Sequence, residues 1–134
     1  MRFMMLIYPN IPQDAQWAPT PETIEVMGRF NQQLSDAGVL LALDGLHGTR
    51  EGARVAFTDA GNTVTDGPFA EAKEILGGYW MINVASREEA VGWASRCPAS
   101  PGQTIEVRRV QELEDFPPEV RDLAGLKGEP PAAS

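Results

Sequence analysis

Two segments of this 134-residue chain are apolar at nearly every position, and they constrain its fold more than any other feature. They are "RFMMLIY" at residues 2–8 and "LGGYWMINV" at residues 76–84. Successive side chains of a strand point to opposite faces of its sheet, so a strand that is apolar on both alternations has both faces covered. We therefore predict that both segments are central strands of one sheet.

Capping signals predict two helices. The first begins at Thr20-Pro21-Glu22, with a hydroxyl N-cap, proline at the first helical position and an acid in the first turn, and it stops at Gly38. Its apolar stripe comprises Ile24, Met27, Phe30, Leu34 and Ala37. The second begins with a capping box in which Ser86 is the cap and Glu89 reaches back, and it ends before Pro98.

Further strands are expected at residues 39–46 and 104–110, and "ARVAFTD" and "NTVTD" predict a hairpin around Ala60-Gly61. The order is βαβ, a hairpin insertion, then βαβ, which predicts an α+β, ferredoxin-like split βαβ sandwich. In that topology the first and third core strands are central, in agreement with their apolar character. The expected domain covers residues 1–110, and residues 111–134 form an acidic, proline-rich tail that is partly ordered at most.

Two helices can cover only one face of a four-stranded sheet. The apolar side chains of the other face then need a different cover, whether these are Met4, Leu6, Trp80 and Ile82 or the residues that alternate with them. Exposed apolar patches of that size mark interfaces. We expect a homodimer that packs sheet against sheet, with a cavity between or beside the sheets.

Composition excludes several function classes. The net charge of −8 argues against binding to nucleic acid or to anionic membranes, which requires basic patches. A single cysteine, Cys97, cannot form an intramolecular disulfide and fits a reducing compartment. The apolar run of residues 3–7 is too short for a signal sequence or a membrane span, so we expect a cytoplasmic protein.

Four motifs, "DGPFAEAKE", "LGGYWMINV", "EEAVGWASRCP" and "IEVRRV", together resemble the YCII-related family, specifically its DGPF-motif branch. The resemblance covers roughly residues 1–110 and implies a dimeric α+β barrel built from ferredoxin-like subunits. It implies no reaction. Some members are encoded beside, or fused to, extracytoplasmic-function sigma factors, which implies a functional link to a sigma factor. The same superfamily includes muconolactone isomerases and small cofactor-free monooxygenases, an analogy at the level of fold.

The stretch "TDGPFAEAKE" at residues 65–74 has two interpretations. Gly67-Pro68 predicts a stiff corner, Asp66 can accept backbone amide hydrogen bonds, and Phe69 is expected to plug the core. The same stiffness suits a loop that holds a site in place. Both interpretations stay open.

The charges that follow the corner are the main functional candidates. Glu71, Lys73 and Glu74 bring carboxylates and an ammonium near Asp66, where they could bind an anionic substrate or tune an acid or base. The alternative is a surface ion-pair network of small energetic worth.

Other candidates carry weaker signals. His47, the only histidine, lies in a glycine-bracketed loop and is expected to be solvated, and Cys97 is expected to be a buried small hydrophobe. One histidine, one cysteine and scattered acids do not make a ligand cluster, so we predict neither zinc nor another cofactor. Phosphate-loop, dinucleotide-binding and nucleophile-elbow motifs are absent from the sequence.

Two functions from different classes follow. The first is a small-molecule-binding or regulatory homodimer with a small acidic ligand, for which the binding candidates are Tyr8, His47, Phe69, Glu71 and Trp80. The second is a cofactor-independent enzyme of the isomerase, lyase or monooxygenase type that acts on a small organic acid. In that enzyme Asp66 or Glu74 is the acid/base, Lys73 binds the anion, and Tyr8 or His47 lies at the cavity rim. The sequence leaves open whether the protein is an enzyme. A purely structural interaction role has little support beyond the acidic tail.

Overall fold

The structure is a computed structural model that describes residues 1–12, 19–69, 74–121 and 123. Its strands are β1 (Arg2–Tyr8), β2 (Leu40–Gly45), β3 (Ala53–Thr58), β4 (Gly61–Asp66), β5 (Gly78–Asn83) and β6 (Thr104–Arg109). Its helices are α1 (Pro21–Asp36), α2 (Arg87–Ser95) and the short α3 (Pro118–Arg121), with 3-10 turns η1 (Thr49–Glu51) and η2 (Leu113–Asp115).

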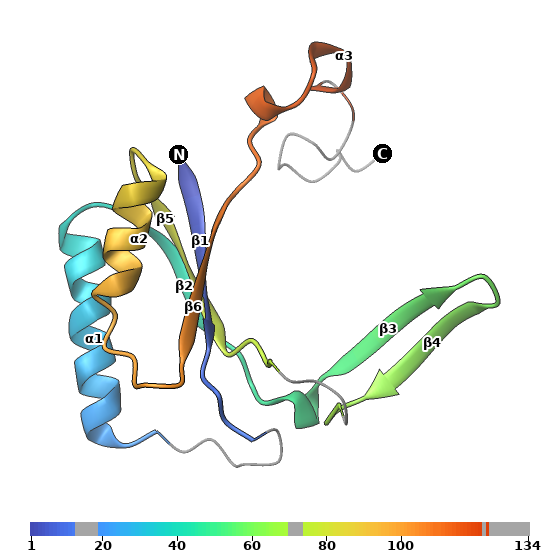
Figure 1. The fold of residues 1–134 in the computed structure, drawn as a ribbon, viewed down its shortest axis with the longest axis horizontal. Coiled ribbons are helices and arrows are strands. Elements are labelled where there is room, and N and C mark those ends of the chain that lie inside the picture. The colour runs from blue at the N-terminus through green and yellow to red at the C-terminus, as the bar shows by residue number, and fades with distance from the viewer. Residues whose placement is uncertain (13–18, 70–73, 122, 124–134) are drawn as a thin grey trace, which may run out of the picture.

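The main sheet has the antiparallel strand order β2-β5-β1-β6, so the two strands predicted to be central are central. Helices α1 and α2 both lie against one face of it (Figure 1). Strands β3 and β4 form a separate hairpin. These elements make an α+β, ferredoxin-like sandwich with a hairpin insertion, as the sequence predicts.

The predicted caps begin both main helices. The Thr20 hydroxyl accepts a hydrogen bond from the Thr23 amide at 3.2 Å, and Pro21 occupies the first turn. The Ser86 hydroxyl accepts one from the Glu89 amide at 3.1 Å. The Glu89 carboxylate accepts from the Ala85 amide at 3.0 Å, one residue before the cap, and so still satisfies a backbone donor at the helix entrance.

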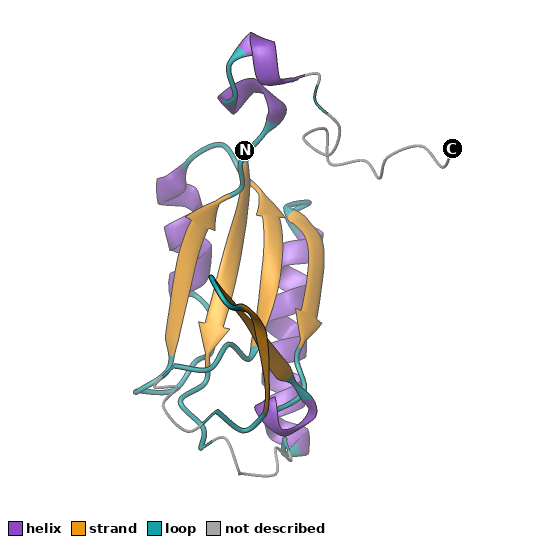
Figure 2. Cartoon of the chain, turned by 90° about the vertical axis from the view of Figure 1, so that its right-hand side faces the viewer, coloured by secondary structure: helices purple, strands orange, loops and turns teal. Residues whose placement is uncertain are grey.

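The hydrophobic core lies between the sheet and the two helices. It takes one alternation of each central strand, with Phe3 and Met5 from β1 and Trp80 and Ile82 from β5, and packs it against helix side chains such as Leu34. The other alternation points to the opposite face, which no helix covers in Figure 2. We call this surface the open face.

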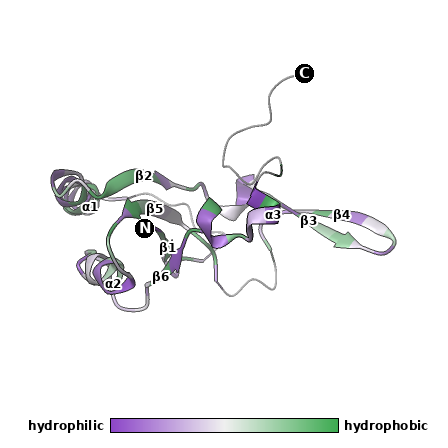
Figure 3. Ribbon diagram, turned by 90° about the horizontal axis from the view of Figure 1, so that it is seen from above, coloured by the Kyte–Doolittle hydropathy of each residue, from purple (hydrophilic) through white to green (hydrophobic). Residues whose placement is uncertain are grey.

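The β3–β4 hairpin extends away from the sheet on the side opposite the helices (Figures 1 and 3). Its strands pair from Ala53 with Asp66 to Thr58 with Gly61. Every residue of both strands is exposed. Within the residues that the structure describes, the open face and the hairpin are therefore both left uncovered.

Candidate binding surface on the open face

The corner at residues 66–69 fastens the hairpin to the 3-10 turn η1. The Gly67 amide donates to the Gly52 carbonyl at 2.9 Å, and the peptide bond between Gly67 and Pro68 is cis. A Cβ on Gly67 would overlap the carbonyl oxygen of Thr49, so only glycine fits. Phe69 is buried, and the Arg54 guanidinium lies 4.1 Å from its ring centroid. This geometry fits the interpretation of the motif as a stiff corner.

Only some of the charged residues predicted to form a catalytic or binding site lie within the described part of the chain. Asp66 is exposed at the end of β4, and Glu74 is exposed ahead of β5. Glu71 and Lys73 lie outside the described residues. Convergence of Asp66, Lys73 and Glu74 on a pocket therefore stays a prediction.

Three further candidates lie on different elements of the fold. His47 is exposed in the loop after β2, where its Nδ1 lies 3.4 Å from Glu51 Oε2, an arrangement of small energetic worth. Trp80 belongs to the core on the helix-covered face. Tyr8, at the end of β1, is half-buried and follows the alternation of Met4 and Leu6, so it belongs to the open face.

The open face has an apolar centre. Met4 of β1 lies opposite Met81 of β5, and Leu6 lies opposite Tyr79, so four large side chains form two adjacent cross-strand pairs. None of the four is fully buried. These four side chains lie on the sheet face that α1 and α2 do not cover.

Polar side chains flank this centre along the β2 side. The Tyr79 hydroxyl donates to Asp44 Oδ2 at 2.7 Å. This hydrogen bond raises the pKa of Tyr79 above its ordinary value, because loss of the phenolic proton would leave two anions in contact. Tyr79 therefore keeps its proton at neutral pH, with its ring on the open face.

Glycines set this pairing. A Cβ on Gly78 would lie 2.8 Å from the Asp44 carbonyl oxygen, and one on Gly77 would lie 2.8 Å from Pro9 side-chain carbons. Gly78 therefore marks a close approach of the β5 and β2 backbones, and Gly77 leaves space for the Pro9 ring. The approach brings β5 against β2 and places Tyr79 opposite Asp44.

Two arginines flank the apolar centre: Arg2 at the N-terminal end of β1 and Arg108 on β6. Arg2 is held by Glu112 in a two-pronged ion pair, with Nε–Oε1 at 2.6 Å and Nη2–Oε2 at 3.0 Å. Arg108 lies opposite Met4, and its Nη1 is 3.5 Å from Glu106 Oε2. The Arg108 side chain is 72% exposed. A guanidinium has five N–H donors, so Arg108 presents cationic donors beside the apolar centre.

Sequence reasoning did not select Arg108, Tyr79 or Asp44. The signal was present in β6, where Ile105 and Val107 alternate with Glu106 and Arg108. This period of two sends the apolar pair to the helix side and the charged pair to the open face. This alternation in β6, combined with the apolar character of β1 and β5, would have predicted an apolar open face with charged residues at its edge.

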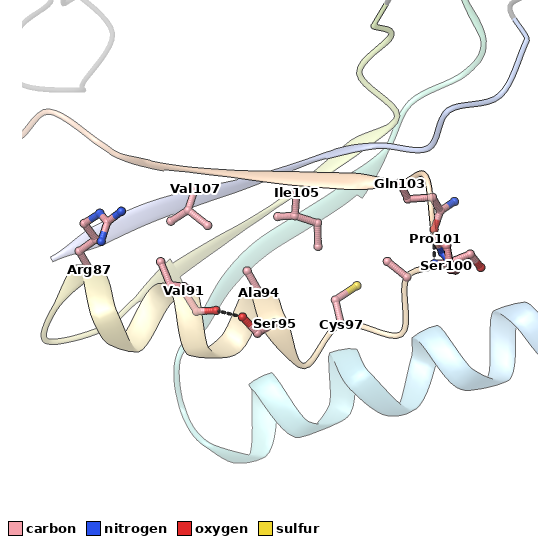
Figure 4. Close-up of a pocket in the computed structure, with 11 residues that line it drawn as sticks. Arg87, Val91, Ala94, Ser95, Cys97, Ser100, Pro101, Gln103, Ile105 and Val107 are labelled. Carbon is pink, nitrogen blue, oxygen red and sulfur yellow. Dashed lines mark hydrogen bonds between the residues drawn. The ribbon is translucent and has the colours of Figure 1, made fainter.

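A separate groove of about 590 Å³ lies between α2 and β6 (Figure 4). Ile105 and Val107 line its β6 side, and Cys97 lies on the opposite side, just after α2. Burial raises the pKa of the Cys97 thiol to about 11, so this half-buried cysteine is not a thiolate nucleophile at neutral pH. The Ser95 hydroxyl in the groove donates a hydrogen bond to the Val91 carbonyl oxygen. The groove has a mixed lining, in which Arg87 lies at one end, Ser100 and Gln103 lie at the other, and apolar side chains lie between them.

Metal and membrane features can be stated for the described part of the chain. No three His, Cys, Asp or Glu side chains gather there in a way that could hold a metal ion. None of the helices described is both long and apolar enough to span a bilayer.

The fold and the open face define the class of this protein: a ferredoxin-like α+β domain with one sheet face uncovered. The sequence model of the YCII-related domain matches residues 1–114. The chain therefore belongs to the YCII-related family. The match extends past the expected boundary at residue 110 and includes Glu112, the partner of Arg2. No curated protein matches the chain.

Proposed function

We propose that this protein is a homodimer that binds a small organic acid on the open face of its sheet. The observation that carries the proposal is the uncovered apolar centre of Met4, Leu6, Tyr79 and Met81 with a cation at its edge. Ligand sites combine apolar walls with a few polar groups that fix orientation. A regulatory role, with a functional link to a sigma factor, rests on the family resemblance alone.

The chemistry of the surface selects the ligand class. Arg108 offers planar paired donors that match a carboxylate, and the Met4–Met81 pair beside it suits a short hydrocarbon body. The Tyr79–Asp44 pair supplies a hydrogen-bond acceptor on the other side of the centre. This arrangement favours an acid with one anionic end and an apolar body over a highly charged ligand.

The experiment is a thermal-shift screen of the full chain with aliphatic and aromatic carboxylates, each paired with its uncharged amide. Binding acids are then measured by calorimetry with Arg108→Gln and the matched control Arg109→Gln. Arg109 is the next residue, alternates to the other face, and lies 3.3 Å from Asp115. Charge-assisted hydrogen bonds contribute about 1.5–3 kcal/mol, so Arg108→Gln should weaken binding about tenfold or more.

Three results would oppose the proposal. One is a screen in which no acid raises Tm more than its amide. Another is equal affinity of the two arginine variants for every acid that binds. The third is a monomer mass at micromolar concentration in sedimentation equilibrium, which would remove the dimer.

The enzyme alternative keeps its sequence support and ranks second. It needs Asp66 and Glu74 to meet Lys73 at a pocket, and the two described carboxylates are both exposed. Ligand binding by the open face needs no such convergence.

A further inference from the structure

The β3–β4 hairpin has one apolar face and one polar face. Val55 pairs with Val64, and Phe57 pairs with Asn62, so the three large apolar side chains share a face. Val55 is 50% exposed, Val64 65% and Phe57 78%. The other face comprises Arg54, Ala56, Thr58, Gly61, Thr63 and Thr65.

This hairpin lacks the packing that such a structure requires. An isolated two-stranded hairpin is marginally stable in water and needs further strands or a covering element. Among the described residues, β3 and β4 contact chiefly each other, and the hairpin base is fastened through Gly67 and the Arg54–Phe69 contact. An exposed phenylalanine on such an arm indicates a docking element.

The hairpin and the open face lie on the same side of the molecule. In Figure 1 the helices occupy one side of the sheet and the hairpin projects from the other. In Figure 2, which looks onto the open face, the hairpin stands in front of the strands. A single partner placed in the angle between them would contact both.

We propose that the hairpin is an arm that two copies of the chain exchange. The face of the hairpin that carries Val55, Phe57 and Val64 packs on the open face of the second copy and forms one wall of the ligand-binding surface of that copy. The inference rests on the proposed function, because the covered surface is the proposed binding surface. It adds Phe57 of the partner subunit to that site, which is incomplete in a single chain.

The areas agree with a stable dimer. With full side-chain areas of roughly 150–250 Å² for large apolar residues, the three arm side chains expose on the order of 350 Å². Two reciprocal contacts that remove a similar area from each open face would bury on the order of 1,400 Å² in total, within the range of standard specific interfaces.

Symmetry favours a second copy over an unrelated protein as the occupant. Each chain carries one arm and one open face, so a two-fold axis matches both in a closed pair. In such a dimer both the apolar face of the hairpin and the open face of the sheet are covered. An unrelated partner would have to supply a complement to each surface separately.

The test compares Phe57→Ser with the matched control Ala56→Ser, which changes the neighbouring residue on the opposite face of the same strand. Sedimentation equilibrium of the full chain should give a dimer for the natural sequence and the control. Phe57→Ser should weaken dimerisation by at least about tenfold, since aromatic anchors dominate interfaces. Near-UV circular dichroism, to which the core residue Trp80 contributes, serves as the check that the fold is retained.

A second measurement locates the arm directly. A photo-reactive benzophenone amino acid in place of Phe57 should cross-link to a peptide containing Met4 or Met81 of an isotopically distinct chain. The same reagent in place of Ala56 should not. This measurement keeps the proposal testable even if Phe57→Ser perturbs folding.

The outcomes separate the arm from the proposed function. If the natural protein is a dimer whose affinity is unchanged by Phe57→Ser, and no cross-link reaches the second copy's open face, the arm is refuted and the ligand proposal stands. If arm cross-links form but no carboxylate binds, the ligand proposal is refuted and the arm stands. A natural protein that is monomeric at micromolar concentration overturns both.

Discussion

The indole nitrogen of Trp80 donates a 2.7 Å hydrogen bond to the side-chain oxygen of Asn31. The bond joins β5 to α1 across the core, beside a T-shaped contact between the Trp80 and Phe30 rings with centroids 5.7 Å apart. A buried indole N–H without a partner costs free energy, so this bond fixes the position of the helix along the strand.

Replacing Asn31 should therefore destabilise the protein. Asn31→Leu leaves the indole donor unpaired in the core, at a cost of about 1–3 kcal/mol. Denaturant unfolding followed by tryptophan fluorescence measures the loss. Gln32→Leu is the control, because Gln32 bonds to Asp36 on the exposed side of the same helix. Equal stability of the Asn31 variant and the natural protein would contradict this role.

Gly67→Ala should be among the most damaging small substitutions in the chain. The added methyl would overlap the backbone oxygen of Thr49, which cannot move away without opening the η1 turn. Overpacking of this kind costs about 1–3 kcal/mol, and calorimetric Tm should fall accordingly. Gly48→Ala is the matched control, since φ there is −59° and no atom lies within 4 Å of the position that its methyl would take. Similar Tm values for both variants would contradict the packing argument.

The Arg2–Glu112 ion pair should make stability depend on pH. Its hydrogen bond to Arg2 lowers the pKa of Glu112 below the ordinary 4.5. A lowered folded-state pKa contributes stability that is fully present above the unfolded-state pKa and disappears as pH falls through the folded-state pKa. Glu112→Gln should thus lower Tm at pH 7 and converge with the natural protein in acid.

The control for this prediction is Glu114→Gln, a neighbouring exposed glutamate. Its Tm should follow that of the natural protein from pH 7 down to acid. A Glu112→Gln difference that stays constant with pH would show that the ion pair is not its cause.

The Tyr79–Asp44 hydrogen bond should be visible in a spectroscopic titration. Asp44 raises the pKa of Tyr79, so Asp44→Asn should move the titration toward the ordinary value of 10.0. Ultraviolet absorbance of the phenolate measures it, in a Tyr8→Phe background that leaves Tyr79 as the single tyrosine. An unchanged titration in Asp44→Asn would exclude the charged carboxylate of Asp44 as the cause.

Much of the fold could be predicted from short-range patterns. Thr20-Pro21 and Ser86 mark helix starts because capping is local chemistry, and the apolar character of β1 and β5 reflects their place at the centre of the sheet. The ferredoxin-like α+β fold class could be predicted from the order of strands and helices along the chain. The long-range pairing of β1 with β6 needed no separate signal, since the topology requires it.

The candidate site was harder to predict, because it depends on registers between strands. That Met4 faces both Met81 and Arg108 is a property of two pairings, and no local motif encodes either of them. The motif "TDGPFAEAKE" drew the functional hypothesis because its charges are crowded in sequence. The need for glycine at position 67 of this motif instead comes from its close approach to Thr49, a residue outside the motif.

The place of β1 in the sheet has a consequence for how the chain assembles. Residues 2–8 pair with residues 78–83 and 104–109, so β1 can pair only after these much later segments have been synthesised. The hairpin, by contrast, closes between adjacent segments. Contacts of large sequence separation slow folding. We expect the apolar strand β1 to stay unpaired until those later segments exist, which leaves residues 2–8 open to self-association during synthesis.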